Sequence, residues 1–370
     1  MKPRKLIGAV VAVLVLGVML ACGGGSSNGG GGGGAAKALY VSNNAPNDAS
    51  GSISGFTVDA GSGTLSPIAG SPFPETGGHP TWLAAGGSTV FFASSSPTGV
   101  GAAAIGSGNA LANVSLNTTG EIGGMTVTPD GSAVLIADRT NRTLGAYKAS
   151  NGTLSAFGTP AVTDTTPAAV VITPNAKYVY VINASIFSTV TRFSYEASTG
   201  DLALLTGTDT SFPAAGGVGD VEASRAAIDR TGHFLIANSA SGYLYVFLIN
   251  SDGSLTWSGE NVPVSPYDAL GGVAASPIAN YVYTVDRVTN EVYGFSIGSN
   301  GFLSPIKGLP VATGASPISV AIDPSGKVLY VVNQGDNSLS AYTIASDGSL
   351  TALSTTTAVG STPVDLVFAQ

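Results

Sequence analysis

A short apolar motif recurs seven times along the chain, and this repetition constrains the fold more than any other feature. Its clearest copies are Leu39-Tyr40-Val41-Ser42-Asn43 and the segments 179–183 and 329–333. The second residues of the seven copies are Tyr40, Phe92, Ile136, Tyr180, Ile236, Tyr283 and Tyr330. They are 52, 44, 44, 56, 47 and 47 residues apart, which matches the roughly 40–50 residues of one four-stranded propeller blade.

The last repeat shows how each unit is built. Residues 317–323 alternate between apolar and small or polar side chains, and the Pro-Ser-Gly at 324–326 then forms a tight turn. Residues 328–333 are almost continuously apolar, which indicates a second strand covered on both faces. A third strand is expected at 339–345, and the Asp-Gly at 347–348 is a hairpin signal before a fourth. The alternative fold, two unrelated β-sandwich domains, would not explain a four-strand order that is common to the repeats.

The two ends of the chain predict how the ring closes. The first repeat begins with a second-strand motif at 39–43, and the chain ends with a lone strand at 363–369. The last strand can complete the first blade, and this pairing removes two exposed sheet edges. We therefore expect residues 36–370 to form one all-β domain. We expect this domain to be a monomeric seven-bladed β-propeller with four antiparallel strands per blade.

Residues 1–21 have the features of a bacterial signal peptide. Three basic residues precede an apolar run at 6–20, which is too short for a membrane span of roughly 20 residues. The run ends in Met-Leu-Ala-Cys, which resembles the lipobox of bacterial lipoproteins. The resemblance implies cleavage before Cys22 and lipid attachment to it, with residues 22–35 as a glycine-rich tether. An ordinary secreted protein and a signal anchor are the alternatives.

The predicted localisation is the bacterial cell envelope. A lipid on Cys22 would make the membrane a partner of the protein. Gly23, rather than Asp, follows the cysteine, and by the lipoprotein rule this implies anchoring in the outer membrane.

Composition excludes several kinds of partner and site. The chain has 14 Lys and Arg against 22 Asp and Glu, and removal of the leader with its three bases leaves a net charge of 11 − 22 = −11. Such a chain offers few cations to replace phosphate counterions, so we expect no nucleic-acid partner. One Cys and two His provide little for a thiolate or histidine metal site, and no acidic loop has calcium-binding spacing. We expect no metal and no cofactor.

The Tyr-Val-x-Asn strand with a downstream Gly-x-Leu resembles the YVTN-repeat and lactonase-type seven-bladed propellers. The lactonase group includes 6-phosphogluconolactonase. Segments 55–59 with 63–65, and 231–238, match well. The lactonases begin one inner strand with Pro-Arg-His, where this chain has Ser224-Arg225-Ala226, so the Arg is kept and the His is not. The Asn-Pro-Ser of the relatives corresponds to His79-Pro80-Thr81, and their later acidic residue is absent.

Candidate site residues gather where second strands end and inner strands begin, because these points share one face of a propeller. His79 or Glu222 could activate water, and Arg225 could hold the developing oxyanion of a lactone. Predicted ligand-binding residues on the same rim are Arg139, Asp220, Asp268 and Arg287. Each has a structural alternative: Arg225 could pair with Asp220 or Glu222, and the rim Asp-Arg pairs could tie blades together.

Three functions remain open from the sequence. The favoured hypothesis is a membrane-tethered binding scaffold that presents its loop face to a protein, a glycan or a small molecule. The second is a metal-independent, lactonase-like hydrolase, as the resemblance implies. An exported enzyme would need a lactone other than 6-phosphogluconolactone, which is a cytoplasmic metabolite. The third is a surface-structural propeller.

Overall fold

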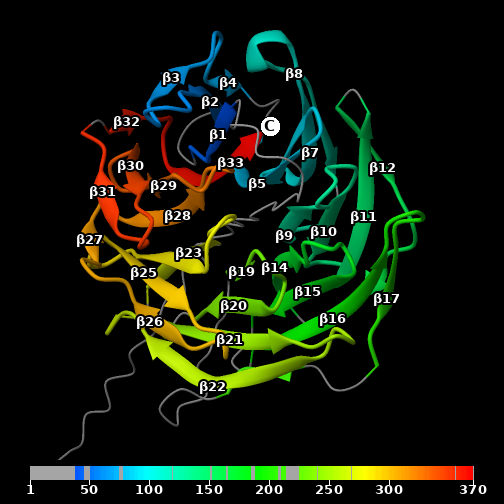
Figure 1. The fold of residues 1–370 in the computed structure, drawn as a ribbon. Helices are drawn as coiled ribbons and strands as arrows, with labels where there is room; N and C mark the ends of the chain where they lie inside the picture. The colour runs from blue at the N-terminus through cyan, green and yellow to red at the C-terminus, as the bar shows by residue number, and fades with distance from the viewer. Residues whose placement is uncertain are drawn as a thin grey trace, which may run out of the picture.

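The computed structural model describes residues 38–45, 51–74, 78–118, 120–150, 152–163, 166–184, 188–206, 210–213, 225–239, 241–267, 269–354 and 356–369. Seven antiparallel sheets stand around a central axis as the blades of a propeller (Figure 1). This confirms the predicted fold. Each blade has four main strands in the order predicted for the last repeat. No helix within these ranges is long and apolar enough to cross a membrane.

The blades are numbered 1 to 7 from the chain's first strand, and their strands form concentric layers. The innermost strands are β33 (Pro363–Ala369), β5 (Pro80–Gly86), β9 (Ile122–Val127), β14 (Pro167–Ile172), β19 (Ala226–Ile228), β23 (Leu270–Ala275) and β28 (Pro317–Ile322). The second strands are β1 (Ala38–Asn43), β6 (Thr89–Ser95), β10 (Val134–Asp138), β15 (Tyr178–Asn183), β20 (Phe234–Asn238), β24 (Tyr281–Asp286) and β29 (Val328–Asn333).

The outer layers complete the blades. The third strands are β2 (Ser52–Val58), β7 (Thr98–Ile105), β11 (Thr143–Ser150), β16 (Thr189–Glu196), β21 (Tyr243–Ile249), β25 (Glu291–Ile297) and β30 (Ser338–Ile344). The fourth are β3 (Leu65–Pro67), β8 (Leu111–Thr118), β12 (Thr153–Ala156), β17 (Asp201–Leu204), β22 (Leu255–Pro263), β26 (Leu303–Pro305) and β31 (Leu350–Ala352). Short strands β4 (Phe73–Pro74), β13 (Ala161–Val162), β18 (Thr210–Ser211), β27 (Val311–Ala312) and β32 (Thr357–Ala358) pair with third strands, and η1 (Ser107–Asn109) is a 3-10 turn.

All seven motif copies lie in second strands, where both faces are covered by neighbouring blades. The predicted alignment of the motif copies is wrong by one residue in blades 2 and 3. The residue that faces the start of the inner strand is Asn43 in blade 1, but Ser94 in blade 2 and Asp138 in blade 3. Aligning Phe92 and Ile136 with Tyr40 predicts Ser95 and Arg139 at this position, because neither copy contains the guiding asparagine.

Ring closure occurs as predicted. β33 pairs antiparallel with β1, and Figure 1 shows the red C-terminal strand beside the blue first strand. The seven inner strands contact one another in the cyclic order β5, β9, β14, β19, β23, β28 and β33. Glycines permit this close approach, since a Cβ on Gly272 would lie 2.9 Å from the backbone nitrogen of Val320 in the next blade.

Tyrosines from the motif fasten four of the seven seams between blades. The hydroxyl of Tyr330 donates to the carbonyl of Gly63 in the next blade, at 2.7 Å. The other three bonds are Tyr40 to Asn109, Tyr180 to Gly253 and Tyr283 to Gly348, each to a backbone carbonyl. We call Tyr40, Tyr180, Tyr283 and Tyr330 the latch tyrosines. The motif asparagine has a different role: Asn183, for example, donates to the hydroxyls of Thr189 and Thr191 in its own third strand.

Candidate functional site

The ends of the second strands and the starts of the inner strands meet at one end of the channel. In six blades the first residue of the inner strand pairs directly with the end of the second strand, as in Pro80 with Ser94 and Pro167 with Asn183. Arg225 stands at the equivalent place in blade 5, since its backbone exchanges hydrogen bonds with Asn238 at the end of β20. His79 directly precedes β5. Two of the three predicted catalytic residues, His79 and Arg225, therefore lie at the same end of the channel.

Arg225 is held firmly by Asn238. Its backbone N–H donates to Oδ1 of Asn238 at 2.9 Å, and its carbonyl accepts from the Asn238 N–H at 3.0 Å. The Asn238 side-chain amide in turn donates to the carbonyl of Gly271 in blade 6. Asn238 therefore differs from the other motif asparagines, because it fixes the start of an inner strand rather than a third strand.

The side chain of Arg225 meets Trp82 of blade 2. Its guanidinium carbon lies 5.1 Å from the centroid of the indole ring, which is cation–π geometry. Trp82 lies in β5, and Arg225 directly precedes β19. Two inner strands, β9 and β14, separate β5 from β19 around the ring. Arg225 is 4% exposed and Trp82 is 1% exposed. The channel thus contains a cation in a largely dry environment, where its charge acts more strongly than in water.

Trp82 also supplies an unused hydrogen-bond donor. Its indole Nε1–H is buried and finds no acceptor among the residues that the structure describes. Buried N–H groups without a partner are uncommon, because each forfeits its hydrogen bond to water. The pair therefore provides a cation and a neutral donor in one place, both suited to an anion or a carbonyl oxygen.

His79 has one ring nitrogen engaged. Its Nδ1 lies 2.6 Å from the carbonyl oxygen of Asn44, and a carbonyl can only accept, so Nδ1 carries the proton. In the neutral ring Nε2 is then the acceptor, which is the state required of a general base. The backbone of His79 is fixed by Ser94 and Ser95 at the end of β6. Within the described ranges, no hydrogen bond joins His79 to Arg225.

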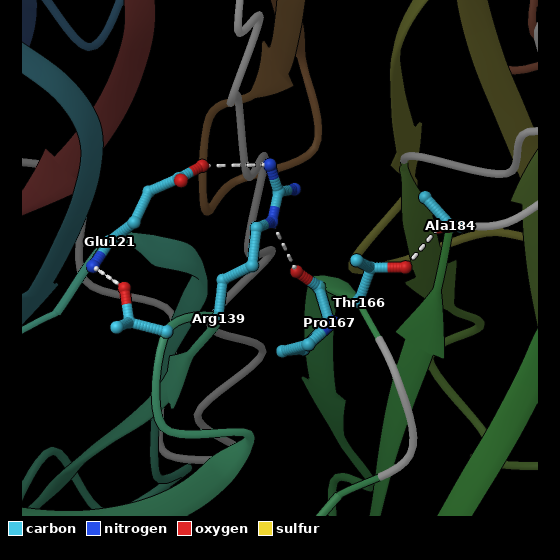
Figure 2. Close-up of polar contacts among 6 residues, drawn as sticks. Glu121, Arg139, Thr166, Pro167 and Ala184 are labelled. Carbon is cyan, nitrogen blue, oxygen red and sulfur yellow. Dashed lines mark hydrogen bonds and ion pairs between the residues drawn. The ribbon is translucent and has the colours of Figure 1, made fainter.

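Arg139 joins two blades. Its Nη1 lies 2.9 Å from Oε1 of Glu121, and its Nε donates to the carbonyl of Pro167 in blade 4 at 3.1 Å (Figure 2). Beside it the hydroxyl of Thr166 donates to the carbonyl of Ala184. The partner is not the preceding Asp138, so the rim Asp-Arg pair is not an ion pair here. Ligand binding by Arg139 stays a prediction.

Arg287 follows the buried Asp286 at the end of β24. One carboxylate oxygen of Asp286 accepts from the backbone N–H groups of Val288 and Thr289, so Asp286 shapes this turn. The backbone N–H of Arg287 donates to the carbonyl of Ala269 at 3.0 Å. Its predicted role in ligand binding also stays a prediction.

Four predicted site residues lie outside the described residues. They are Glu222, Asp220, Asp268 and the lipidation site Cys22. In the part of the chain that is described, no group of three or more His, Cys, Asp or Glu side chains is placed to hold a metal ion.

Sequence reasoning missed Trp82 and Asp365. Counting Arg225 as the first residue in blade 5, the third position of the inner strands is small in five blades. The five residues are Gly124, Ala169, Ala227, Gly272 and Ser319. The two exceptions both make contacts to other blades: Trp82 meets Arg225 across the ring, and Asp365 bonds to Leu83 and Ser319 in the two adjacent blades. A comparison of inner strands, rather than of the motif alone, would have singled them out.

Comparison with known proteins identifies similar chains. The family model described as lactonase, seven-bladed β-propeller, matches residues 109–218 and 264–368. A putative 6-phosphogluconolactonase from Bacteroides uniformis is 20% identical with a TM-score of 0.73, and covers 90% of this chain and 99% of its own. A periplasmic gluconolactonase from Pseudomonas aeruginosa is 16% identical with a TM-score of 0.72, over 90% and 99% of the two chains. At these identities the structures show a shared fold. No curated protein matches the sequence significantly.

Proposed function

Because the chain belongs to the lactonase family of seven-bladed β-propellers, we propose that it hydrolyses a lactone at the end of the channel where His79 and Arg225 lie. The observation that carries the proposal is the pairing of Arg225 with Trp82, which places a cation and an N–H donor where the family match leads us to expect an oxyanion. The family match favours hydrolysis over the binding scaffold that the sequence alone favoured.

The proposed reaction needs a base, an anion holder and a proton donor. His79 Nε2 takes a proton from water, and the resulting hydroxide attacks the lactone carbonyl. The negative charge that develops on the carbonyl oxygen is stabilised by the guanidinium of Arg225 and the indole N–H of Trp82. The ring C–O bond then breaks, and the imidazolium of His79 returns its proton to the leaving oxygen. One water is consumed, and the product is an open-chain hydroxy acid.

We further propose that the substrate is an unphosphorylated sugar lactone outside the cytoplasm. Residues 1–21 support export, and a lipid on Cys22 would hold the propeller at the outer membrane by its tether. The periplasmic gluconolactonase of Pseudomonas aeruginosa has the same fold. A phosphorylated lactone such as 6-phosphogluconolactone would be encountered in the cytoplasm.

Ligand binding without turnover is the second candidate function. It is favoured by the burial of Arg225, whose 4% exposure leaves little of the cation in contact with solvent. A tethered propeller of this kind would hold a ligand at the loop face and release it unchanged. A surface-structural role has no specific observation in its favour.

The test is hydrolysis of a lactone panel by the full chain in detergent, followed by acid release in a pH-stat. The panel contains glucono-δ-lactone, 6-phosphogluconolactone and γ-butyrolactone, and the spontaneous rate is subtracted for each. We expect glucono-δ-lactone to be opened fastest. Folded protein that accelerates none of the three would leave binding without turnover as the account. A preference for the phosphorylated lactone would contradict the proposed substrate.

A further inference from the structure

A pocket of about 180 Å³ opens on the seam between blades 2 and 3. Val100 of β7 forms one wall, and the other wall belongs to blade 3. The apolar residues of that wall are Ile122, Ile136, Leu154 and Ala156. Two polar side chains, Asp138 and Tyr147, also line the pocket. None of the lining residues is His79, Trp82 or Arg225, so the pocket is distinct from the proposed lactone site.

This seam lacks a latch. Tyr40 stands three residues before Asn43 and reaches the next blade, and the equivalent residue three before Ser94 is Phe91. Phenylalanine has no hydroxyl, so the side chain at this position cannot donate to a carbonyl of blade 3. At this position the seam therefore contains an apolar side chain instead of a latch tyrosine, and the pocket lies in the same seam.

Asp138 brings an unneutralised negative charge to the pocket. Its carboxylate accepts from the backbone and side-chain N–H groups of Asn141, each at 2.8 Å, and from the backbone of Gly120 at 3.2 Å. All three donors are neutral. In the described ranges no cation pairs with Asp138, because the following Arg139 is turned to Glu121 and Pro167.

Tyr147 adds a second polar contact and an aromatic face. Its hydroxyl makes no hydrogen bond to any residue in the described part of the chain, and its ring lies over Gly145. Burial, and then the charge of Asp138, raise the pKa of the Tyr147 hydroxyl. A carboxylate, a phenol ring and apolar walls together suit a cation attached to a hydrocarbon body.

We propose that this seam pocket binds a small primary ammonium compound with an apolar body of about six carbons. The ammonium group would sit against Asp138 and the ring of Tyr147, and the hydrocarbon would fill the space between Val100, Ile122 and Leu154. The size follows from the volume, because a cavity of about 150 Å³ accommodates benzene.

The experiment is isothermal titration calorimetry of the full chain with three ligands of equal length: n-hexylammonium, 1-hexanol and hexanoate. We expect one saturable site for hexylammonium, with an affinity about tenfold higher than for hexanol, since a hydrogen bond to a charged group outweighs a neutral one. Hexanoate should not bind. Asp138→Asn should remove the tenfold preference for hexylammonium. Ala156→Trp, a change at an exposed lining position, should block both ligands.

Asp336→Asn is the matched control, because it removes the same charge from a rim aspartate of blade 7 that lines no part of this pocket. It should leave hexylammonium binding unchanged. The proposal is overturned if hexylammonium shows no saturable binding, or if its affinity survives both Asp138→Asn and Ala156→Trp. Equal affinities for hexanol and hexylammonium would also overturn it, because the pocket would then select size without charge. If Asp138→Asn fails to fold, Ala156→Trp still tests the proposal, because hexylammonium that binds this variant as well as the wild type would place the site elsewhere.

Discussion

Asp365 is the residue whose loss should most weaken ring closure. It lies on β33, fully buried, between the inner strands of blades 7 and 2. One carboxylate oxygen accepts from the hydroxyl of Ser319 and the other from the backbone N–H of Leu83, both at 2.9 Å. The last strand of the chain therefore holds both neighbouring blades through a single side chain.

Asp365→Ala leaves two buried donors without this acceptor. An unsatisfied buried donor costs about 1–3 kcal/mol, so the free energy of unfolding should fall by about 2–6 kcal/mol. The backbone bond from Asp365 N–H to the hydroxyl of Ser42 is kept in the variant, so the loss reports the side chain. A loss of this size is a large part of the 5–15 kcal/mol that typically stabilises a domain.

Urea unfolding followed by circular dichroism measures this loss. Asp347→Ala is the control, because Asp347 also accepts from two donors, the N–H and hydroxyl of Ser349, but in an exposed hairpin. Water can replace the carboxylate there, so we expect a much smaller change. Equal losses in the two variants would refute the argument that burial of Asp365 secures the ring.

Three further predictions concern the seams between blades. Gly272→Ala should lower the free energy of unfolding by about 1–3 kcal/mol, since its Cβ would lie 2.9 Å from the backbone nitrogen of Val320; an unchanged urea midpoint would contradict this. Tyr330→Phe should cost about 1 kcal/mol through loss of its bond to Gly63, and a calorimetric Tm equal to that of the wild type would count against the latch. Burial raises the pKa of Tyr40 to about 12, and those of the other latch tyrosines move in the same direction. Their folded pKa values exceed the unfolded value near 10, so stability is full below pH 10 and falls as the pH rises toward 12; a Tm that stays level across this range would contradict it.

The blade number and the ring closure could be predicted from the sequence because both depend on local patterns. The Leu39–Asn43 motif and the terminal strand carry their information in consecutive residues. The predicted alignment of the motif copies was wrong in blades 2 and 3. There Ser94 and Asp138 replace the asparagine, so the sequence does not mark the end of the strand.

The candidate site was only partly predictable. Arg225 and His79 could be placed on one face, because the order of strands fixes which ends meet. The contact of Arg225 with Trp82 could not be predicted, since it joins blades 2 and 5 across the channel and depends on the dimensions of the ring. The role of Asn238 in holding Arg225 could not be predicted either, because the sequence around Asn238 resembles that around the other motif asparagines.

The most direct test of lactone hydrolysis at this site compares Arg225→Met with Arg230→Met on glucono-δ-lactone. Arg230 lies in the turn between β19 and β20, at the other end of these strands, where its Nε donates to Asn280 at 3.2 Å. We predict that Arg225→Met lowers kcat/KM by about 100-fold or more, as loss of an oxyanion donor does, while Arg230→Met stays within about twofold. Arg225→Lys, which keeps the charge, should recover part of the rate. A folded Arg225→Met protein with the wild-type rate would contradict the assignment of the site.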